Sequence, residues 1–301
     1  MSAFVLAHLS DPHLSPLPKP RVHELIGKRA TGLANWYRKR GVAHRPAVLG
    51  QIVADLKQQA TDHIAVTGDL INVALPGEFP PARAWLEMLG TPDDVTLVPG
   101  NHDAYVRRAE RHRQAHWAEY MRGDEANPNA EAFPFLRRRG GVALIGVSSA
   151  VPSLPFMAIG RVGGRQVERL GPLLDASRKQ GLFRVVMIHH PPTSKRAHYL
   201  KRLVDGALLR DTLARHGAEL LIHGHNHRHQ TVQIDGPHGP IPAIGVPSAS
   251  ETPPGKHDPA GYNLYRIEGE PSRWRCEVIS RGFAADGSRI GEIGRSVLER
   301  N

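Results

Sequence analysis

The feature that most restricts the fold of this chain is a series of short apolar runs, each ending in a polar, glycine-rich or histidine-rich turn. Each run has the length of one β-strand and is rich in β-branched residues, and the stretches between several of them have the apolar spacing of helices. This alternation predicts strands and helices layered in an α/β fold. The runs are Phe4 to Leu9, His63 to Thr67, Val95 to Val98, Val142 to Val147, Arg184 to Ile188 and Leu220 to Ile222.

The pattern changes after Gly224, where predicted strands follow one another without helices between them. Such a succession predicts a second sheet that is mainly antiparallel. The residues after Gly282 are charged, so we expect one domain over residues 1–281 and a charged C-terminal tail over residues 282–301. The late strands are Gln230 to Ile234, Ile241 to Val246, Tyr262 to Ile267 and Trp274 to Ile279.

Acidic, amide and imidazole side chains gather in five segments that directly follow predicted strands. In an open α/β sheet, the loops that leave the carboxyl ends of the strands converge on one crevice, so residues far apart in sequence can meet there. We therefore expect one site built from five loops. The segments are Ser10-Asp11-Pro12-His13, Gly68-Asp69, Gly100-Asn101-His102-Asp103, His189-His190-Pro191-Pro192 and Gly224-His225-Asn226-His227.

The donor atoms in these segments are nitrogen and oxygen. Carboxylate, amide oxygen and imidazole ligands suit Mn, Fe, Zn, Co or Ni, and they contain too much nitrogen for a dedicated Ca or Mg site. Seven donors exceed the needs of one tetrahedral ion, whereas two ions about 3.5–4 Å apart that share a carboxylate would use them all. The single cysteine, Cys276, excludes an internal disulfide framework and zinc sites built from several cysteines.

The ordered set Asp-x-His, Gly-Asp, Gly-Asn-His-Asp, His and Gly-His-x-His resembles the signature of the calcineurin-like binuclear metallophosphoesterases. Its local contexts, HLSDPH, VTGDL, VPGNHD, IHHPP and HGHNH, are similar to the bacterial class III cyclic-nucleotide phosphodiesterase branch. The likeness runs from about Leu6 to His227. It implies an α/β fold in which two central mixed β-sheets pack as a sandwich flanked by helices.

The resemblance also implies a centre of two metal ions and assigns the ligands to them. One ion would be held by Asp11, His13 and His227, the other by Asn101, His189 and His225, and Asp69 would bridge both. Mn or Fe, as a divalent or mixed-valence pair, are the expected ions, and Zn, Co or Ni stay open.

The two residues after Asn101 receive catalytic roles from the same resemblance. His102 would stabilise the transition state and protonate the leaving oxygen, and Asp103 would orient His102. A hydroxide that bridges the metals would be the nucleophile. No residue is assigned to substrate binding.

These inferences predict a metal-dependent phosphoric ester hydrolase, and more specifically a phosphodiesterase with a nucleotide-like substrate. A cyclic nucleotide is the leading substrate by resemblance alone. One alternative is a pyrophosphatase that acts on a nucleotide-lipid at the membrane surface, although that branch of the family carries Arg at the position of His102. Another is a non-catalytic binding scaffold, but such relatives lose ligands that this chain keeps.

A basic insertion over residues 16–45 separates the first two metal motifs. It contains eight Lys and Arg residues and one acidic residue, Glu24, and its apolar residues recur at roughly helical spacing despite Gly27 and Gly32. Three interpretations stay open: a solvated helix packed on the domain, a lip that contacts substrate, and a peripheral membrane contact through Trp36, Tyr37 and the basic residues.

The net charge of +10, with His neutral, favours anionic partners, and a small phosphoester is the expected one. Other basic clusters, such as Arg137-Arg138-Arg139, lack interleaved aromatic residues or a nucleic-acid-binding motif, so no specific nucleic acid is predicted. A homo-oligomer stays open. The N-terminus lacks the features of a signal peptide and no apolar run is long enough to span a membrane, so we expect a cytoplasmic protein.

Overall fold

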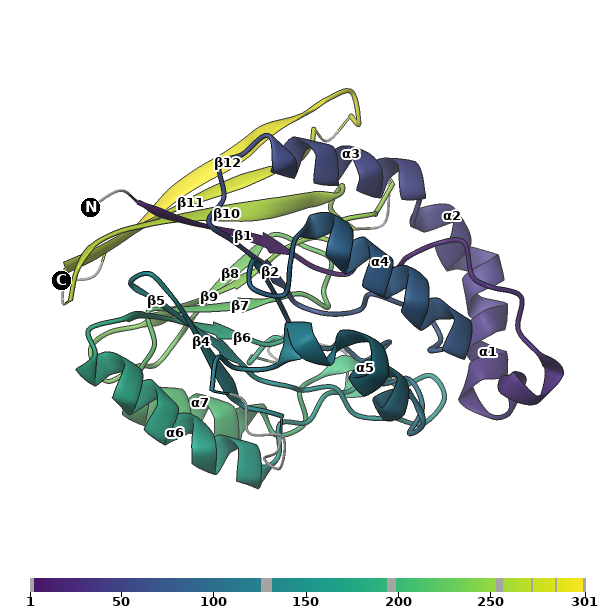
Figure 1. The fold of residues 1–301 in the computed structure, drawn as a ribbon, viewed down its shortest axis with the longest axis horizontal. Coiled ribbons are helices and arrows are strands. Elements are labelled where there is room, and N and C mark those ends of the chain that lie inside the picture. Colours follow the sequence, from purple (N-terminus) through teal and green to yellow (C-terminus); the bar gives the residue numbers. More distant parts are fainter. Residues whose placement is uncertain are drawn as a thin grey trace.

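Two six-stranded mixed sheets pack face to face and are flanked by helices (Figure 1). The computed structural model describes residues 3–125, 132–193, 199–252, 257–271, 273–284 and 286–299. The predicted sandwich of two mixed sheets is therefore confirmed. Among the described residues, no helix is both long and apolar enough to cross a membrane.

The first sheet has the strand order β12-β11-β10-β1-β2-β3. Strands β1, β2 and β3 are parallel to one another, and β10, β11 and β12 join them as an antiparallel meander. Helices α3 (Pro46–Lys57) and α4 (Phe79–Leu89) connect the parallel strands. The strands are β1 (Phe4–Leu9), β2 (His63–Val66), β3 (Val95–Leu97), β10 (Gly261–Glu270), β11 (Arg273–Phe283) and β12 (Ile290–Glu299).

The second sheet has the order β4-β5-β6-β7-β9-β8, with four parallel strands between two antiparallel edge strands. Helices α6 (Gly164–Lys179) and α7 (Gly206–His216) cover its outer face, and α5 (Ala109–Trp117) packs against α4. The strands are β4 (Phe135–Arg139), β5 (Val142–Gly146), β6 (Phe183–Met187), β7 (Leu220–His223), β8 (Gln230–Ile234) and β9 (Ile241–Gly245).

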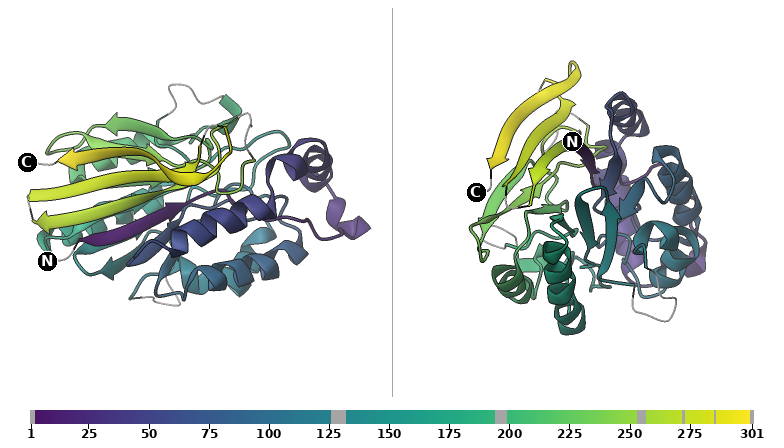
Figure 2. Two further views of the ribbon diagram at one scale, coloured as in Figure 1. Left: turned by 90° about the horizontal axis from the view of Figure 1, so that it is seen from above. Right: turned by 60° about the vertical axis from the view of Figure 1, so that its left-hand side comes forward.

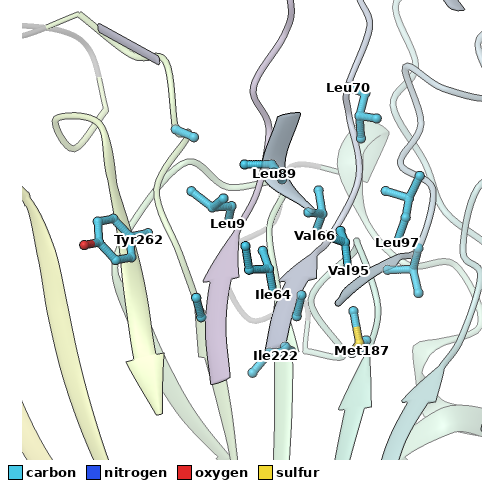
Figure 3. Close-up of a cluster of buried hydrophobic side chains, with 14 of the residues drawn as sticks. Leu9, Ile64, Val66, Leu70, Leu89, Val95, Leu97, Met187, Ile222 and Tyr262 are labelled. Carbon is cyan, nitrogen blue, oxygen red and sulfur yellow. The ribbon is translucent and has the colours of Figure 1, made fainter. Parts of the chain in front are cut away.

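The period-two alternation of the strands divides the core into two layers. In β6, Val185 and Met187 join the cluster between the two sheets, whereas Val186 joins the cluster beneath α6 and α7. Figure 3 shows Met187 in one cluster with Val66, Val95 and Leu97 of the first sheet. Burying each such side chain contributes about 1.5–3 kcal/mol, so both sheets hold the strand ends in fixed positions.

We expected the late strands to form a second sheet of their own, and this prediction was wrong. Strands β8 and β9 complete the second sheet, where Ala243 of β9 pairs with Leu221 of β7, while β10 joins the first sheet through Tyr265 and Leu6 of β1. The alternation of residues identifies a strand but not its neighbour, because pairing between distant segments depends on packing.

The segment expected to be a charged tail, 282–301, instead includes strand β12. Its residues Ile290 and Leu298 pair with Phe283 and Cys276 of β11 and pack against the core. The charges that suggested a tail belong to an edge strand, where Arg295 pairs with Glu277 at 2.9 Å. Charged edge strands are common because they prevent further strand addition.

The basic insertion forms a helical projection at the end of the molecule opposite both termini (Figures 1 and 2). It contains the turn η1 (Val22–Leu25), α1 (Lys28–Asn35), the single π-helical turn η2 (Trp36–Arg40) and α2 (Gly41–Ala43). Helix α1 begins after Gly27, whose φ of 73° is one that few other residues adopt. Gly32 lies so near the Tyr105 ring that a Cβ atom there would overlap the hydroxyl group.

Candidate metal centre

The five loops predicted to form one site converge at the carboxyl ends of β1, β2, β3, β6 and β7. Backbone hydrogen bonds join them: the Asp11 amide donates to the Gly68 carbonyl at 3.0 Å, and the Gly224 amide donates to the His189 carbonyl at 3.1 Å. Gly68 has no room for a side chain, since a Cβ atom would overlap the backbone of Gly100. The glycine of the Gly-Asp motif therefore allows two ligand loops to touch.

Five of the predicted ligands have a left-handed backbone conformation. They are Asp11, His13, Asp69, His225 and His227, with φ between 41° and 68°. This region favours glycine, but Asp, Asn and His enter it more readily than other side chains do. The turns point these side chains back toward the convergence of the loops.

One group of donors surrounds the first predicted metal position. The Nε2 atom of His227 lies 3.1 Å from Oδ1 of Asp11 and 3.4 Å from Nε2 of His13. Nε2 of His13 in turn lies 4.0 Å from Oδ2 of Asp69. Asp11, His13 and Asp69 are buried and His227 is partly buried.

A second group meets on the other side of Asp69. Nε2 of His189 lies 3.2 Å from Oδ1 of Asn101 and 3.4 Å from the same Oδ2 atom of Asp69. The His225 ring lies 5.1 Å from the His189 ring, and Nε2 of His225 is 2.8 Å from the Lys201 carbonyl oxygen. Asp69 Oδ2 thus lies between the two donor groups, as a bridging ligand would.

Hydrogen bonds at the far nitrogens orient two of these imidazoles. Nδ1 of His189 lies 2.6 Å from the Thr67 carbonyl oxygen, and Nδ1 of His13 lies 3.4 Å from that of Ile71. A ring that donates from Nδ1 presents the lone pair of Nε2 to a metal. Oriented imidazoles beside buried carboxylate and amide oxygens fit a pair of transition-metal ions.

The carboxylates and imidazoles of the site stabilise each other's charged forms. Burial raises the pKa of the Asp69 carboxyl, but attraction to His189 and His102 outweighs burial and lowers it to about 2. Burial lowers the pKa of His189, yet Asp69 and Asp11 raise it to about 9. The carboxylates attract imidazoles, which are positively charged when protonated. A metal cation would take the place of the imidazole protons in this cluster.

The two predicted catalytic residues occupy different environments. The His102 amide donates to Oδ1 of Asp69 at 2.7 Å, its Nδ1 contacts the Asn72 carbonyl oxygen, and its ring lies 5.0 Å from the His13 ring. The Asp103 carboxylate accepts the backbone amides of Asp69 at 2.8 Å and Gly100 at 2.9 Å. These bonds of Asp103 fix the loop that carries Asp69.

His190, which is not among the predicted ligands, adjoins the second donor group. Its Nδ1 atom lies 2.8 Å from Oγ of Ser149 and its Nε2 atom 3.2 Å from the Ala158 carbonyl oxygen. Both ring nitrogens thus have protein partners, although the ring lies 4.3 Å from that of His225.

Two groups beside the first donor set were not predicted. Oε2 of Glu251 lies 3.6 Å from Nδ1 of His227 and 3.8 Å from Nε2 of His44, which belongs to the basic insertion. Glu251 is only 3% exposed. It follows β9, outside every ligand motif, and a lone Glu in a loop gives no signal in the sequence.

A cavity of about 280 Å³ opens beside Asn101 and His102. Helix α1 and η2 of the insertion form one wall, with Lys28, Gly32 and Trp36, and the loop after β5 contributes a second. The Lys28 ammonium lies 4.3 Å from the Tyr105 ring centroid and donates to Oγ of Ser153 at 2.7 Å. The insertion therefore forms part of the cavity wall.

Comparisons with known proteins agree with this geometry. A protein of Synechococcus sp. named "Probable cyclic nucleotide phosphodiesterase" is 27% identical over 233 residues, which cover 75% of this chain and 80% of that protein. A dimetal phosphatase from Danio rerio aligns over the whole of both chains with a TM-score of 0.67 and 11% identity. A purple acid phosphatase from yellow lupin seeds aligns over all of this chain and 54% of its own length, with a TM-score of 0.62 and 12% identity.

At these identities the two solved structures show a shared fold and no more. The family model of the calcineurin-like phosphoesterases matches residues 4–229, a range that contains every predicted ligand. This match covers most of the chain and confirms the resemblance found in the motifs. The chain belongs to the calcineurin-like phosphoesterase family.

Proposed function

We propose that this protein is a phosphodiesterase that uses two metal ions to hydrolyse a nucleotide-like, anionic substrate. The observation that carries the proposal is the position of Asp69, whose Oδ2 atom lies between the donor group of Asp11, His13 and His227 and that of Asn101, His189 and His225. When bound, two ions at such a site activate a water nucleophile and offset charge on the phosphoryl group. Mn or Fe suits these donors, as do Zn, Co and Ni.

His102 acts on the substrate in this proposal rather than on a metal ion. Its Nδ1 atom contacts a backbone carbonyl and its ring borders the cavity, where we place the leaving oxygen of the substrate. A proton donated there assists departure of the leaving group. Asp103, which was predicted to orient His102, is a positioning residue, because its carboxylate accepts the amides of Gly100 and Asp69 and so ties the loop of His102 to that of Asp69.

The cavity beside His102 would take the organic part of the substrate. Trp36 and Tyr105 offer aromatic surface to a flat group, while the ammonium of Lys28 attracts an anion. The name of the Synechococcus relative supports a cyclic nucleotide within this class.

Replacing Lys28 with Gln tests the role of the α1 wall. We expect the KM for a soluble anionic diester to rise about ten- to a hundredfold, because an ion-assisted contact contributes roughly 1.5–3 kcal/mol, while kcat stays near that of wild type. Arg38→Gln is the matched control, since Arg38 is an exposed cation of the same insertion. Equal KM values for wild type and Lys28→Gln would contradict the proposed contact.

Glu251 gives a second prediction, this one about metal affinity. We expect Glu251→Gln to raise the metal dissociation constant about 10–100-fold, because a carboxylate beside a ligating imidazole fixes its orientation and basicity. The measurement is metal titration of the apoprotein by calorimetry. Glu219→Gln, which alters a glutamate paired with Arg184 away from the site, should bind metal as wild type does.

The assay that tests the proposed function compares hydrolysis of bis-p-nitrophenyl phosphate with that of p-nitrophenyl phosphate in the presence of Mn. Faster metal-dependent cleavage of the diester supports the proposal, and cyclic nucleotides are the next substrates to assay. Preference for the monoester would make the protein a phosphatase. Full metal occupancy without cleavage of any phosphoester would favour the non-catalytic scaffold.

A nucleotide-lipid is the second candidate substrate, because large apolar side chains are exposed around the cavity. Phe156, which lines the cavity, is 83% exposed. A pyrophosphatase for such a substrate would cleave a nucleotide-lipid faster than the bis-p-nitrophenyl ester or a cyclic nucleotide.

A further inference from the structure

Three chain segments that border the cavity share an unusual surface composition. They are residues 14–46, which include α1, residues 148–163, and residues 199–204, and they contribute Lys28, Phe156 and Lys201 to the cavity. Lys28 fastens the first segment to the second through Oγ of Ser153 and the Met157 carbonyl oxygen. The second segment is bonded to the third, because the Ala158 amide donates to the Leu200 carbonyl at 2.8 Å.

These segments concentrate the exposed apolar surface of the molecule. Among the described residues, every large apolar side chain that is more than about half exposed lies in one of them. We call these side chains the apolar rim: Val22, Ile26, Tyr37, Leu154, Phe156 and Tyr199, with exposed fractions from 65% to 90%. Exposed apolar side chains gathered on segments that are bonded to one another indicate an interaction surface.

The same segments are almost free of negative charge. They contain eleven Lys and Arg residues and a single acidic residue, Glu24, whose carboxylate accepts the Arg21 amide. Lys19, Arg21 and Arg38 are exposed beside the rim residues of the insertion. An apolar surface bordered by cations is complementary to a layer that presents anionic headgroups above hydrocarbon.

We propose that the apolar rim docks on a bilayer surface that contains anionic lipids. The rim residues enter the headgroup region and the surrounding Lys and Arg side chains bind lipid phosphates, while Tyr37 and Tyr199 are of the type that prefers the boundary between the two. Because Phe156 belongs to both the rim and the cavity, docking places the cavity mouth at the lipid surface. The surface is independent of which phosphoester the site hydrolyses.

Vesicle sedimentation tests the proposal with the whole protein. We expect wild type to sediment with vesicles of equal phosphatidylcholine and phosphatidylglycerol, and not with phosphatidylcholine alone, and added salt should weaken the binding. Ile26→Ser with Leu154→Ser should lower the partition coefficient about tenfold or more. Lys19→Gln with Arg21→Gln should lower it about thirtyfold, since each charge near an anionic surface contributes roughly 1 kcal/mol.

Matched controls separate the rim from the rest of the surface. Ile293→Ser with Val297→Ser removes exposed apolar side chains of β12, and Arg178→Gln with Lys179→Gln removes cations at the end of α6. Both should bind vesicles as wild type does, and the Ile26/Leu154 variant should still hydrolyse a soluble diester at the wild-type rate. That second readout distinguishes failure of docking from failure of the proposed function.

Three results would overturn the proposal. Wild type could fail to bind the anionic vesicles at low salt. The controls could lose as much binding as the rim variants, which would show attraction by net charge alone. Finally, the rim could join two copies of the chain, in which case analytical ultracentrifugation would show a dimer that Ile26→Ser with Leu154→Ser dissociates, and vesicles would not be bound.

Discussion

Replacement of Asp69 by Asn is expected to lower diester hydrolysis roughly a thousandfold or more, because charge stabilisation at a two-metal site contributes several kcal/mol. Asp69 is buried, and its Oδ2 atom faces both His13 and His189. An amide of the same shape keeps the packing but loses the negative charge shared by the two donor groups. Metal content by mass spectrometry should fall below two ions per chain.

A control must show that this loss is not caused by unfolding. Asp55→Asn removes a carboxylate that is ion-paired with Arg281 at 2.8 Å on the far side of the first sheet, and it should keep both metal content and turnover. Circular dichroism should match wild type for both variants. Wild-type turnover in Asp69→Asn would mean that the convergence of donors on Asp69 has no part in catalysis.

Replacement of His102 by Ala should reduce turnover about a hundredfold or more while metal content stays at the wild-type level. The imidazole borders the cavity and is not a member of either donor group, so its loss removes a proton donor without removing a metal ligand. The measurements are kcat for the diester and metal content of the purified variant.

Substrates with different leaving groups distinguish the two roles predicted for His102, which are proton donation and stabilisation of charge in the transition state. A nitrophenolate departs without a proton, whereas an alkoxide needs one, so a general acid matters more for an alkyl ester than for a nitrophenyl ester. The loss in His102→Ala should therefore be larger for a methyl ester than for bis-p-nitrophenyl phosphate. Equal losses would assign His102 to charge stabilisation alone, and lost metal would make it a structural support.

The sandwich of two mixed sheets was implied by the resemblance of the motifs, whereas the sequence pattern itself was sufficient to predict α/β layering and the convergence of the loops. Both follow from local signals: buried strands such as β2 and β6 are short apolar runs, and the residues that follow them, Asp69 and His189, are recognisable in order. Because parallel strands end at one edge of a sheet, the order of motifs was enough to place these groups together.

The parts that were not predicted depend on contacts between distant segments. Strand β12 was not predicted because its charged residues suggested a tail. Glu251 was not predicted because it lies outside all the motifs, although it adjoins His227 and His44. The three interpretations of the basic insertion could not be separated either. Contacts that the sequence does not show, such as packing of Gly32 against Tyr105 and bonding of Lys28 to Ser153, place α1 in the cavity wall.

The left-handed turns at the predicted ligands imply that chemistry and thermodynamic stability oppose each other in this chain. A non-glycine residue in such a conformation costs about 1–3 kcal/mol, and the turns at Asp11, Asp69 and His225 each carry this cost. Glycine would relax the same turns while removing a donor atom. Selection for heat resistance alone would thus favour loss of the site, and a laboratory evolution campaign on this scaffold must select for turnover together with stability.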